Sequence, residues 1–240
     1  MGILMLVAAG PFPVAAVAPD QTADQLYANR SVLADAQRAA ALWEEALARD
    51  PDDFDAAWKL ARAGYYLGQR LATDAARAAA YESGMAAARK AIAAQPDRPE
   101  GYFWLAANMG GLAEQGGMRS GLKFRTPVRE NLEKVLAMDP GFQKGSADRA
   151  LGRWYFKVPG LFGGSKRKSE EHLRRSLTYD PNSSASKVFL AETLQATGRT
   201  SEAIALLQSV LDTPVDPEWA PEDRDFKAQA KRLLAQWQEG

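Results

Sequence analysis

The chain has 240 residues, with 30 basic and 30 acidic side chains, no cysteine and one histidine. A chain of this length can bury a substantial core, and its 46% hydrophobic and 25% charged residues exclude a globally disordered protein. The absence of cysteine excludes disulfides, thiolate zinc sites and iron–sulfur sites. The balanced net charge gives no reason to expect a nucleic acid as partner.

The first segment, residues 3–18, is apolar and ends in Ala16-Val17-Ala18, an A-x-A cleavage pattern. It is too short to span a membrane as a helix, so no integral membrane span is expected. We expect residues 1–18 to be a signal peptide or a disordered apolar N-terminus, and residues 19–240 to form a single helical repeat domain. A periplasmic or secreted location is the first expectation, and a cytoplasmic location is the alternative.

Helix-forming residues dominate the rest of the chain, and apolar residues at helical spacing predict a series of helices. In chain order, the predicted apolar faces are Leu42–Leu47, Phe54–Tyr65, Phe103–Met109, Leu132–Leu136, Val188–Leu194, Ala203–Val210 and Phe226–Trp237. Thr126-Pro127 resembles a cap followed by a first-turn proline, which predicts that a helix begins there. The last segment is polar apart from its apolar stripe, as in a helix that caps the exposed end of a repeat array.

These helices are arranged in repeats. Prolines recur at positions 51, 96, 140 and 181, each at the end of a similar helical phrase. Each is followed nine or eleven residues later by a leucine and a small residue: Leu60-Ala61, Leu105-Ala106, Leu151-Gly152 and Leu190-Ala191. A unit of 41 to 45 residues that closes the same way each time indicates an internal repeat of paired helices.

Two stretches depart from this pattern. Gly110-Gly111 and Gly116-Gly117 lie in or after a predicted helix, where glycine is unfavourable, so we expect close backbone packing or a bend. Val158–Ser165 predicts a long turn between two helices. The neighbouring Gly163–Lys166 lacks the spacing of a phosphate-binding loop, which leaves a turn with Ser165 as helix cap, or weak anion capture, as the two interpretations.

The unit that follows Pro181 resembles the tetratricopeptide repeat (TPR). Its 34 residues to Val215 match the repeat length, and Leu190-Ala191, Leu194, Gly198 and Ala203 match the consensus positions. The resemblance implies an all-α fold, a TPR-like α-solenoid of about five helix pairs plus a C-terminal capping helix.

A narrower resemblance covers roughly residues 40 to 215. The phrases that carry it are Trp58-x-Leu60-Ala61-Arg62, Gly101-Tyr102-x-Trp104-Leu105-Ala106-x-Asn108 and Leu151-Gly152-Arg153-x-Tyr155-x-Lys157-x-Pro159-Gly160. They are similar to the T-component family of tripartite ATP-independent periplasmic (TRAP) transporters and to the TPR region of the regulator of microtubule dynamics proteins. The first resemblance implies a periplasmic protein that forms trimers and contacts a solute-binding subunit, although this chain lacks that family's lipidated cysteine.

We expect no enzyme, cofactor or metal. The single histidine, His172, lies in a helix rich in charged residues, where a solvated or hydrogen-bonded role is expected. Adjacent acidic pairs such as Glu44-Glu45 diverge by about 100° on a helix and cannot converge on one substrate.

The expected function is non-catalytic binding or scaffolding on the concave face of the solenoid. The partner would be a protein segment or a small apolar or anionic ligand, and residues 119–175 carry a local charge excess of +8 that suits an anion. The alternatives are a cytosolic TPR adaptor and an envelope assembly or lipid-handling factor. Candidate groove residues are Trp58, Tyr65, Trp104, Asn108, Arg153, Tyr155 and Lys157.

Each of these candidates also has a structural interpretation. The aromatic side chains could belong to the core, because every helix of a solenoid packs on its neighbours. Asn108 could bond between helices, and Arg153, Tyr155 and Lys157 could brace the long turn.

Overall fold

The computed structural model describes residues 21–238, which form eleven α-helices, one short 3₁₀ turn and no strand. The expected export signal at residues 1–18 lies outside this range. The helices are α1 (Ala23–Ala28), α2 (Leu33–Arg49), α3 (Phe54–Gly68), α4 (Asp74–Ala94), α5 (Pro99–Gln115), α6 (Gly117–Met138), α7 (Phe142–Lys157), α8 (Lys166–Tyr179), α9 (Ser184–Gln195), α10 (Thr200–Asp212) and α11 (Ala220–Gln238).

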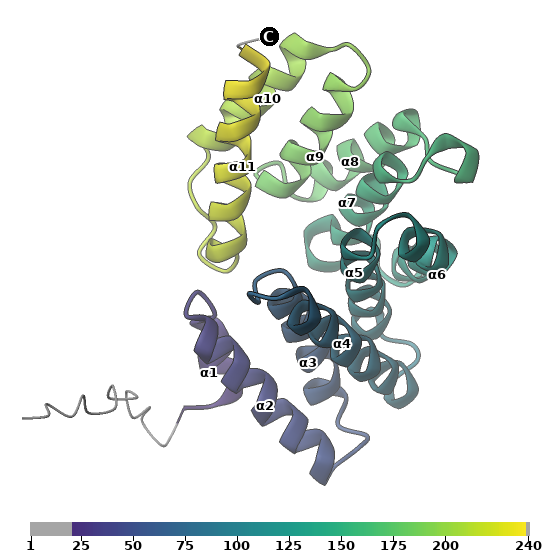
Figure 1. Ribbon diagram of the computed structural model, residues 1–240, viewed down its shortest axis with the longest axis vertical. Helices are drawn as coiled ribbons and strands as arrows, with labels where there is room; N and C mark the ends of the chain where they lie inside the picture. Colours follow the sequence, from purple (N-terminus) through teal and green to yellow (C-terminus); the bar gives the residue numbers. More distant parts are fainter. Residues whose placement is uncertain (1–20, 239–240) are drawn as a thin grey trace, which may run out of the picture.

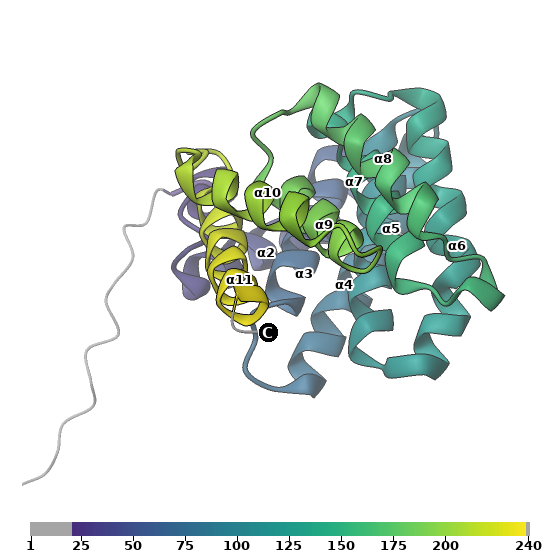
Figure 2. The ribbon, with the colours of Figure 1, turned by 90° about the horizontal axis from the view of Figure 1, so that it is seen from above.

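Each helix packs mainly on the next one along the chain, and α3, α5, α7, α9 and α11 also meet in succession across the repeats. This arrangement makes five helix pairs, from α1–α2 to α9–α10, with α11 as the additional terminal helix (Figure 1). The predicted all-α solenoid with a capping helix is confirmed. The stack curves so strongly that α11 returns to the side of the molecule that holds α1 (Figures 1 and 2).

The recurring prolines end the second helix of each of the first four pairs. The residues directly before these prolines are the C-caps of α2, α4, α6 and α8: Asp50, Gln95, Asp139 and Asp180. Proline cannot continue a helix and disfavours helical geometry in the preceding residue, so the period in the sequence becomes the period of the fold. Side-chain caps begin several of the helices, among them Asp53 on α3 and Ser165 on α8.

The predicted helix start at Thr126-Pro127 is wrong, because α6 runs unbroken through Pro127. A proline inside a helix removes one backbone hydrogen bond and crowds the preceding turn. Tertiary contacts hold this turn in place: the indole Nε1 of Trp154 on α7 donates to the Arg125 carbonyl at 2.9 Å. Within α6 itself, the Asn131 side chain donates to the Pro127 carbonyl at 2.7 Å. Packing against the next repeat thus overrides a local stop signal.

One glycine of each pair has an identifiable role: Gly117 lies at a bend, as expected, whereas Gly111 makes a close contact with a side chain in place of the expected backbone, and Gly110 has open space around it. Gly111 lies against the ring of Tyr81, where an added Cβ would come within 2.3 Å of a ring carbon. Gly117 has φ of +66° at the turn between α5 and α6, a conformation that glycine adopts without steric cost. The first therefore marks a close helix contact and the second a tight turn.

Candidate functional site

The curved stack brings its first and last repeats together. Arg30, in the turn between α1 and α2, donates from Nε to Glu222 Oε1 on α11 at 2.9 Å and from Nη2 to Oε2 at 2.7 Å. Its Nη2 also donates to the Glu218 carbonyl at 2.8 Å. The Arg30 side chain is only 7% exposed, so this two-pronged ion pair is largely removed from water.

Aromatic rings surround the same guanidinium. Its central carbon lies 5.2 Å from the ring centroid of Tyr27 and 5.8 Å from the centroids of Tyr66 and Trp219. Burial lowers the pKa of Arg30, but the hydrogen bonds and charge of Glu222 outweigh it and hold that pKa above its ordinary value. Arg30 is therefore a permanently charged link between the two ends of the chain.

Two further ion pairs tie the C-terminal segment to earlier repeats. Arg70, just after α3, pairs with Asp225 on α11, and Lys144 on α7 lies 3.1 Å from Asp216 in the connection between α10 and α11. Lys144 belongs to a left-handed turn at the start of α7, with φ of +57°, a conformation that costs energy in a non-glycine residue. The end-to-end junction is defined here by these cations and their acidic partners: Arg30, Arg70, Lys144, Asp216, Glu218, Glu222 and Asp225.

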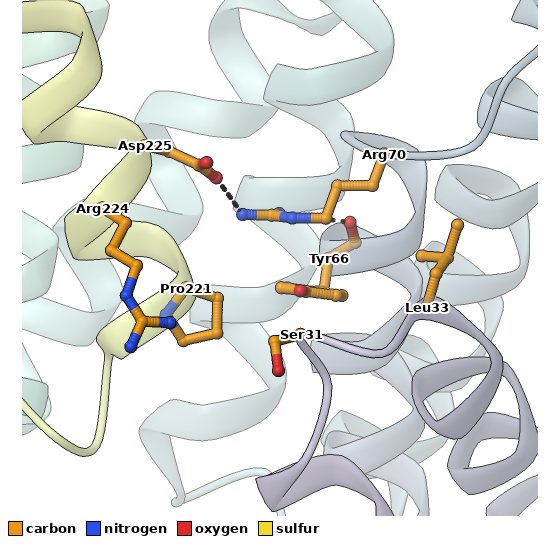
Figure 3. Close-up of a pocket in the computed structure, with 7 residues that line it drawn as sticks. All are labelled: Ser31, Leu33, Tyr66, Arg70, Pro221, Arg224 and Asp225. Atoms are coloured by element: carbon orange, nitrogen blue, oxygen red, sulfur yellow. Dashed lines mark hydrogen bonds and ion pairs between the residues drawn. The ribbon is translucent and has the colours of Figure 1, made fainter.

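Two cavities flank this junction. The first, of about 270 Å³, is shown in Figure 3 and is lined by Ser31, Leu33, Tyr66, Arg70, Pro221, Arg224 and Asp225. In that view Arg70 extends over the Tyr66 ring to reach Asp225, and Arg224 lies beside Pro221 on the opposite wall. The second, of about 240 Å³, is lined by Asp24, Tyr27, Ala28, Arg30, Arg62, Pro217, Glu218 and Trp219.

Arg62 distinguishes the second cavity. Its guanidinium lies 4.2 Å from the Tyr27 ring centroid and 4.9 Å from that of Trp58. Within residues 21–238 it has no acidic side chain at ion-pair distance, and its buried Nε has no hydrogen-bond acceptor. Burial lowers the pKa of Arg62, because moving its charge out of water is unfavourable. An anion that enters the cavity would relieve this cost.

Three of the predicted groove residues lie near one another along α3 and α5. Trp58 is partly buried, and its indole donates to Asp55 at 2.9 Å, beside the stacked Arg62. Tyr65 and Trp104 contact each other across α3 and α5, with ring centroids 6.0 Å apart. Trp104 is 4% exposed, so most of its surface is core.

Asn108 is not accessible to a ligand. It is fully buried, and its Nδ2 donates to the Ala61 carbonyl on α3 at 2.9 Å and to the Trp104 carbonyl at 2.7 Å. The first bond joins two repeats. The inter-helix interpretation of Asn108 therefore describes its geometry, and the groove interpretation does not, because its Nδ2 bonds inside the protein, while the buried Oδ1 has no donor among the described residues.

Arg153, Tyr155 and Lys157 lie at the end of α7. Arg153 donates to Glu192 on α9 at 2.6 Å and stacks on Phe189 at 4.5 Å, so it braces two repeats. Tyr155 is 7% exposed and lies parallel to the His172 imidazole, with centroids 5.3 Å apart. Lys157 is exposed. The structure thus gives the first two side chains bracing contacts and leaves only the third open to solvent.

Sequence reasoning missed the end-to-end junction altogether. Arg62 was visible in the Leu60-Ala61-Arg62 phrase, but no local signal marks it as lacking an acidic partner within the described part of the chain. Arg30 and Glu222 are 192 residues apart, and only the curvature of the stack brings them together.

Within the described part of the chain, no group of three or more His, Asp or Glu side chains is placed to hold a metal ion. His172 bonds through Nδ1 to the buried Asp148 at 2.7 Å, which is the hydrogen-bonded role expected of it. No helix among residues 21–238 is both long and apolar enough to cross a membrane.

Antiparallel helix pairs stacked with a terminal capping helix define a TPR-type helical-repeat protein, and a tetratricopeptide repeat model matches residues 168–236. The model of regulator of microtubule dynamics proteins 1-3 matches residues 21–162, more than half of the chain. The chain belongs to that family. This match favours the second of the two narrower resemblances seen in the sequence.

Solved structures show the same fold. A thermophilic TPR protein of Thermus thermophilus, TTC0263, has a TM-score of 0.66 at 23% identity, over 89% of this chain and 95% of that one. PilF of Pseudomonas aeruginosa has a TM-score of 0.54 at 18% identity, over 91% of each chain. A MamA structure has a TM-score of 0.52 at 15% identity, over 84% of this chain and 95% of that one. No curated protein matches the sequence.

Proposed function

We propose that this chain is a non-catalytic TPR binding protein that holds an acidic segment of a partner protein at the end-to-end junction. The observation that carries the proposal is Arg62, a partly buried cation without an acidic partner among the described residues, in the wall of a 240 Å³ cavity. The cavity also offers Tyr27 and Trp219 as apolar and aromatic surface.

The chemistry of this cavity selects a carboxylate joined to an apolar group. Asp24 and Glu218 also line it, but Asp24 pairs with Lys59 at 2.9 Å and Glu218 lies 4.0 Å from Lys144. Arg62 therefore keeps its charge available, and a planar guanidinium can donate hydrogen bonds to both oxygens of one carboxylate. Since stacked repeats hold these side chains in place beforehand, binding would cost little ordering entropy.

The test is selection from a library of displayed peptides with the wild-type protein. Peptides that combine Asp or Glu with aromatic or aliphatic residues should be enriched. The variant Arg62→Met keeps the length of the side chain and removes its charge, and it should weaken the selected peptides by at least about tenfold. Arg89→Met, at an exposed position of α4, is the matched control and should bind like the wild type. Equal binding by both variants would refute the assignment.

The cellular setting is a separate part of the proposal. We propose an exported protein that serves as the helical partner of a TRAP-type uptake system and contacts its periplasmic solute-binding subunit. The Leu151–Gly160 phrase and the apolar residues 1–18 support it, and the latter lie outside the described residues. The family match, by contrast, is equally compatible with a cytosolic adaptor.

Three measurements separate these settings. N-terminal sequencing of the mature protein distinguishes an exported chain from an uncleaved cytosolic one. The mass in solution tests the trimer that the T-component resemblance implies. Transporter subunits encoded beside this gene, or a solute-binding protein that copurifies with the chain, would support the uptake role, and their absence would remove it.

A further inference from the structure

The connection between α7 and α8 presents an apolar side chain to solvent. It contains the 3₁₀ turn Gly160–Phe162, and Leu161 at its apex is 89% exposed, compared with 49% or less for every other exposed large hydrophobic residue described. The connection projects from the edge of the stack opposite α11 (Figures 1 and 2). This exposure sets Leu161 apart from the other apolar side chains of the described surface and leaves its apolar area available to a partner.

Backbone hydrogen bonds fix the conformation of the turn and keep Leu161 exposed. Phe162 and Gly164 both donate their backbone N–H groups to the Pro159 carbonyl, at 2.8 and 3.2 Å, and Ser165 N–H donates to the Tyr155 carbonyl at 2.9 Å. Gly163 adopts φ of +102°, which glycine allows without strain. Four backbone hydrogen bonds within and around the turn, including Gly163 N–H to Gly160 O at 3.1 Å, therefore oppose the collapse of Leu161 onto the surface.

Two basic segments of the chain meet at this turn. The turn rests on α6, where the Arg125 guanidinium lies 5.6 Å from the Phe162 ring centroid and the Trp154 indole bonds to the Arg125 carbonyl. Residues 120–129 and 157–168 together contain seven basic residues and no acidic one: Lys123, Arg125, Arg129, Lys157, Lys166, Arg167 and Lys168.

Most of this charge is free to act on a partner. Within the described residues only Arg129 and Arg167 pair with carboxylates, those of Glu133 and Glu171. Lys123, Lys157 and Lys168 are exposed and have no such partner there. The basic tip is defined here as Leu161 together with these basic residues of segments 120–129 and 157–168.

We propose that the basic tip docks the protein on an anionic lipid surface. Leu161 would enter the interface between headgroups and acyl chains, while the surrounding lysines and arginines pair with lipid phosphates. The tip combines a strongly exposed apolar side chain with basic residues on both sides of it in the sequence, and this combination suits insertion into a bilayer interface better than capture of an extended acidic peptide. The end-to-end junction lies on the far side of the stack, so it stays accessible in the docked protein (Figure 1).

The magnitudes make this docking measurable. Transfer of one leucine out of water strengthens partitioning by roughly tenfold or more. Each lysine near an anionic surface adds roughly fivefold, and salt weakens this part by screening. The two contributions act together, because the membrane supplies both an apolar layer and negative charge.

The experiment is co-sedimentation of the full chain with vesicles of phosphatidylglycerol and phosphatidylcholine, compared with vesicles of phosphatidylcholine alone. Wild-type protein should bind the anionic vesicles only, and less at high salt. Leu161→Ala should lower partitioning about tenfold, and Lys157→Glu with Lys168→Glu should lower it further. Circular dichroism should show unchanged helix content, because all three positions are exposed.

A matched control separates local from global charge. Arg89→Glu with Lys90→Glu makes the same change in net charge at exposed positions of α4 and should leave partitioning nearly unchanged. Equal losses in the two double variants, or full binding by Leu161→Ala, would overturn the proposal. Binding to poly-L-glutamate but not to vesicles would also overturn it and would assign the tip to an acidic protein. This test does not involve Arg62, so its result is independent of the peptide-binding proposal.

Discussion

The ion pair between Arg30 and Glu222 should decide whether the last helix stays attached to the first repeat. Glu222→Ala leaves the Arg30 guanidinium, at 7% exposure, with the Glu218 carbonyl as its remaining acceptor. Loss of one partner from a fully buried pair costs about 3–5 kcal/mol. Glu222 is 21% exposed and the carbonyl remains, so we expect about 2–3 kcal/mol here.

A double-mutant cycle isolates the pair. Arg30→Met and Glu222→Gln each remove one charge, and the two together leave neither group charged and unpaired. The coupling free energy should be about 1–3 kcal/mol in urea unfolding. Because repeat arrays open locally, hydrogen exchange in α11 should quicken roughly 30- to 150-fold in Glu222→Ala, while exchange in α5 stays near its wild-type rate. A coupling below about 0.5 kcal/mol, with unchanged exchange in α11, would refute the closed junction.

Four further perturbations test packing and burial. Asn108→Ala removes the hydrogen bond that joins α3 to α5 and should cost about 1–3 kcal/mol in thermal or urea unfolding; no loss would show that the bond is not formed. Gly64→Ala places Cβ 2.7 Å from the Gly84 backbone and should destabilise by about 1–3 kcal/mol. Gly110→Ala, with open space around it, should instead stabilise by about 0.5–1 kcal/mol, and a like effect of the two changes would contradict the packing argument. Burial raises the pKa of Tyr27 from 10.0 to about 12, so the stability that its neutral ring supplies should be complete below pH 10 and lost as pH rises to about 12. Helix content measured through this pH range should fall less steeply in Tyr27→Phe than in the wild type. An identical fall in the two proteins would contradict the contribution of Tyr27.

Much of the fold follows from local signals in the sequence. The prolines at 51, 96, 140 and 181 end four helices, because a proline ring excludes the helical conformation before it, whatever the rest of the chain does. The exception is Pro127, where contacts from α7 outweigh the same signal. Local rules therefore hold wherever tertiary contacts do not compete with them.

The candidate site was predictable only in part. Tyr65 and Trp104 were expected on neighbouring first helices, and they do contact each other. Asn108 was expected either to bond between helices or to face the groove, and Tyr155 either to brace the long turn or to face the groove. Periodicity could not separate these alternatives, because each first helix packs on neighbours on several sides. Burial and hydrogen bonding in the structure place both inside.

The sequence by itself determined the unit of this protein: a helix pair that ends at a proline and cannot bury its apolar face alone, repeated until a polar final helix covers the end. The tertiary structure alone decided how far the stack curves. That curvature sums small rotations between successive repeats, so no single segment encodes it. It brings Arg30 to Glu222, leaves Arg62 in a cavity wall without an acidic partner among residues 21–238, and sets the basic tip on the opposite edge.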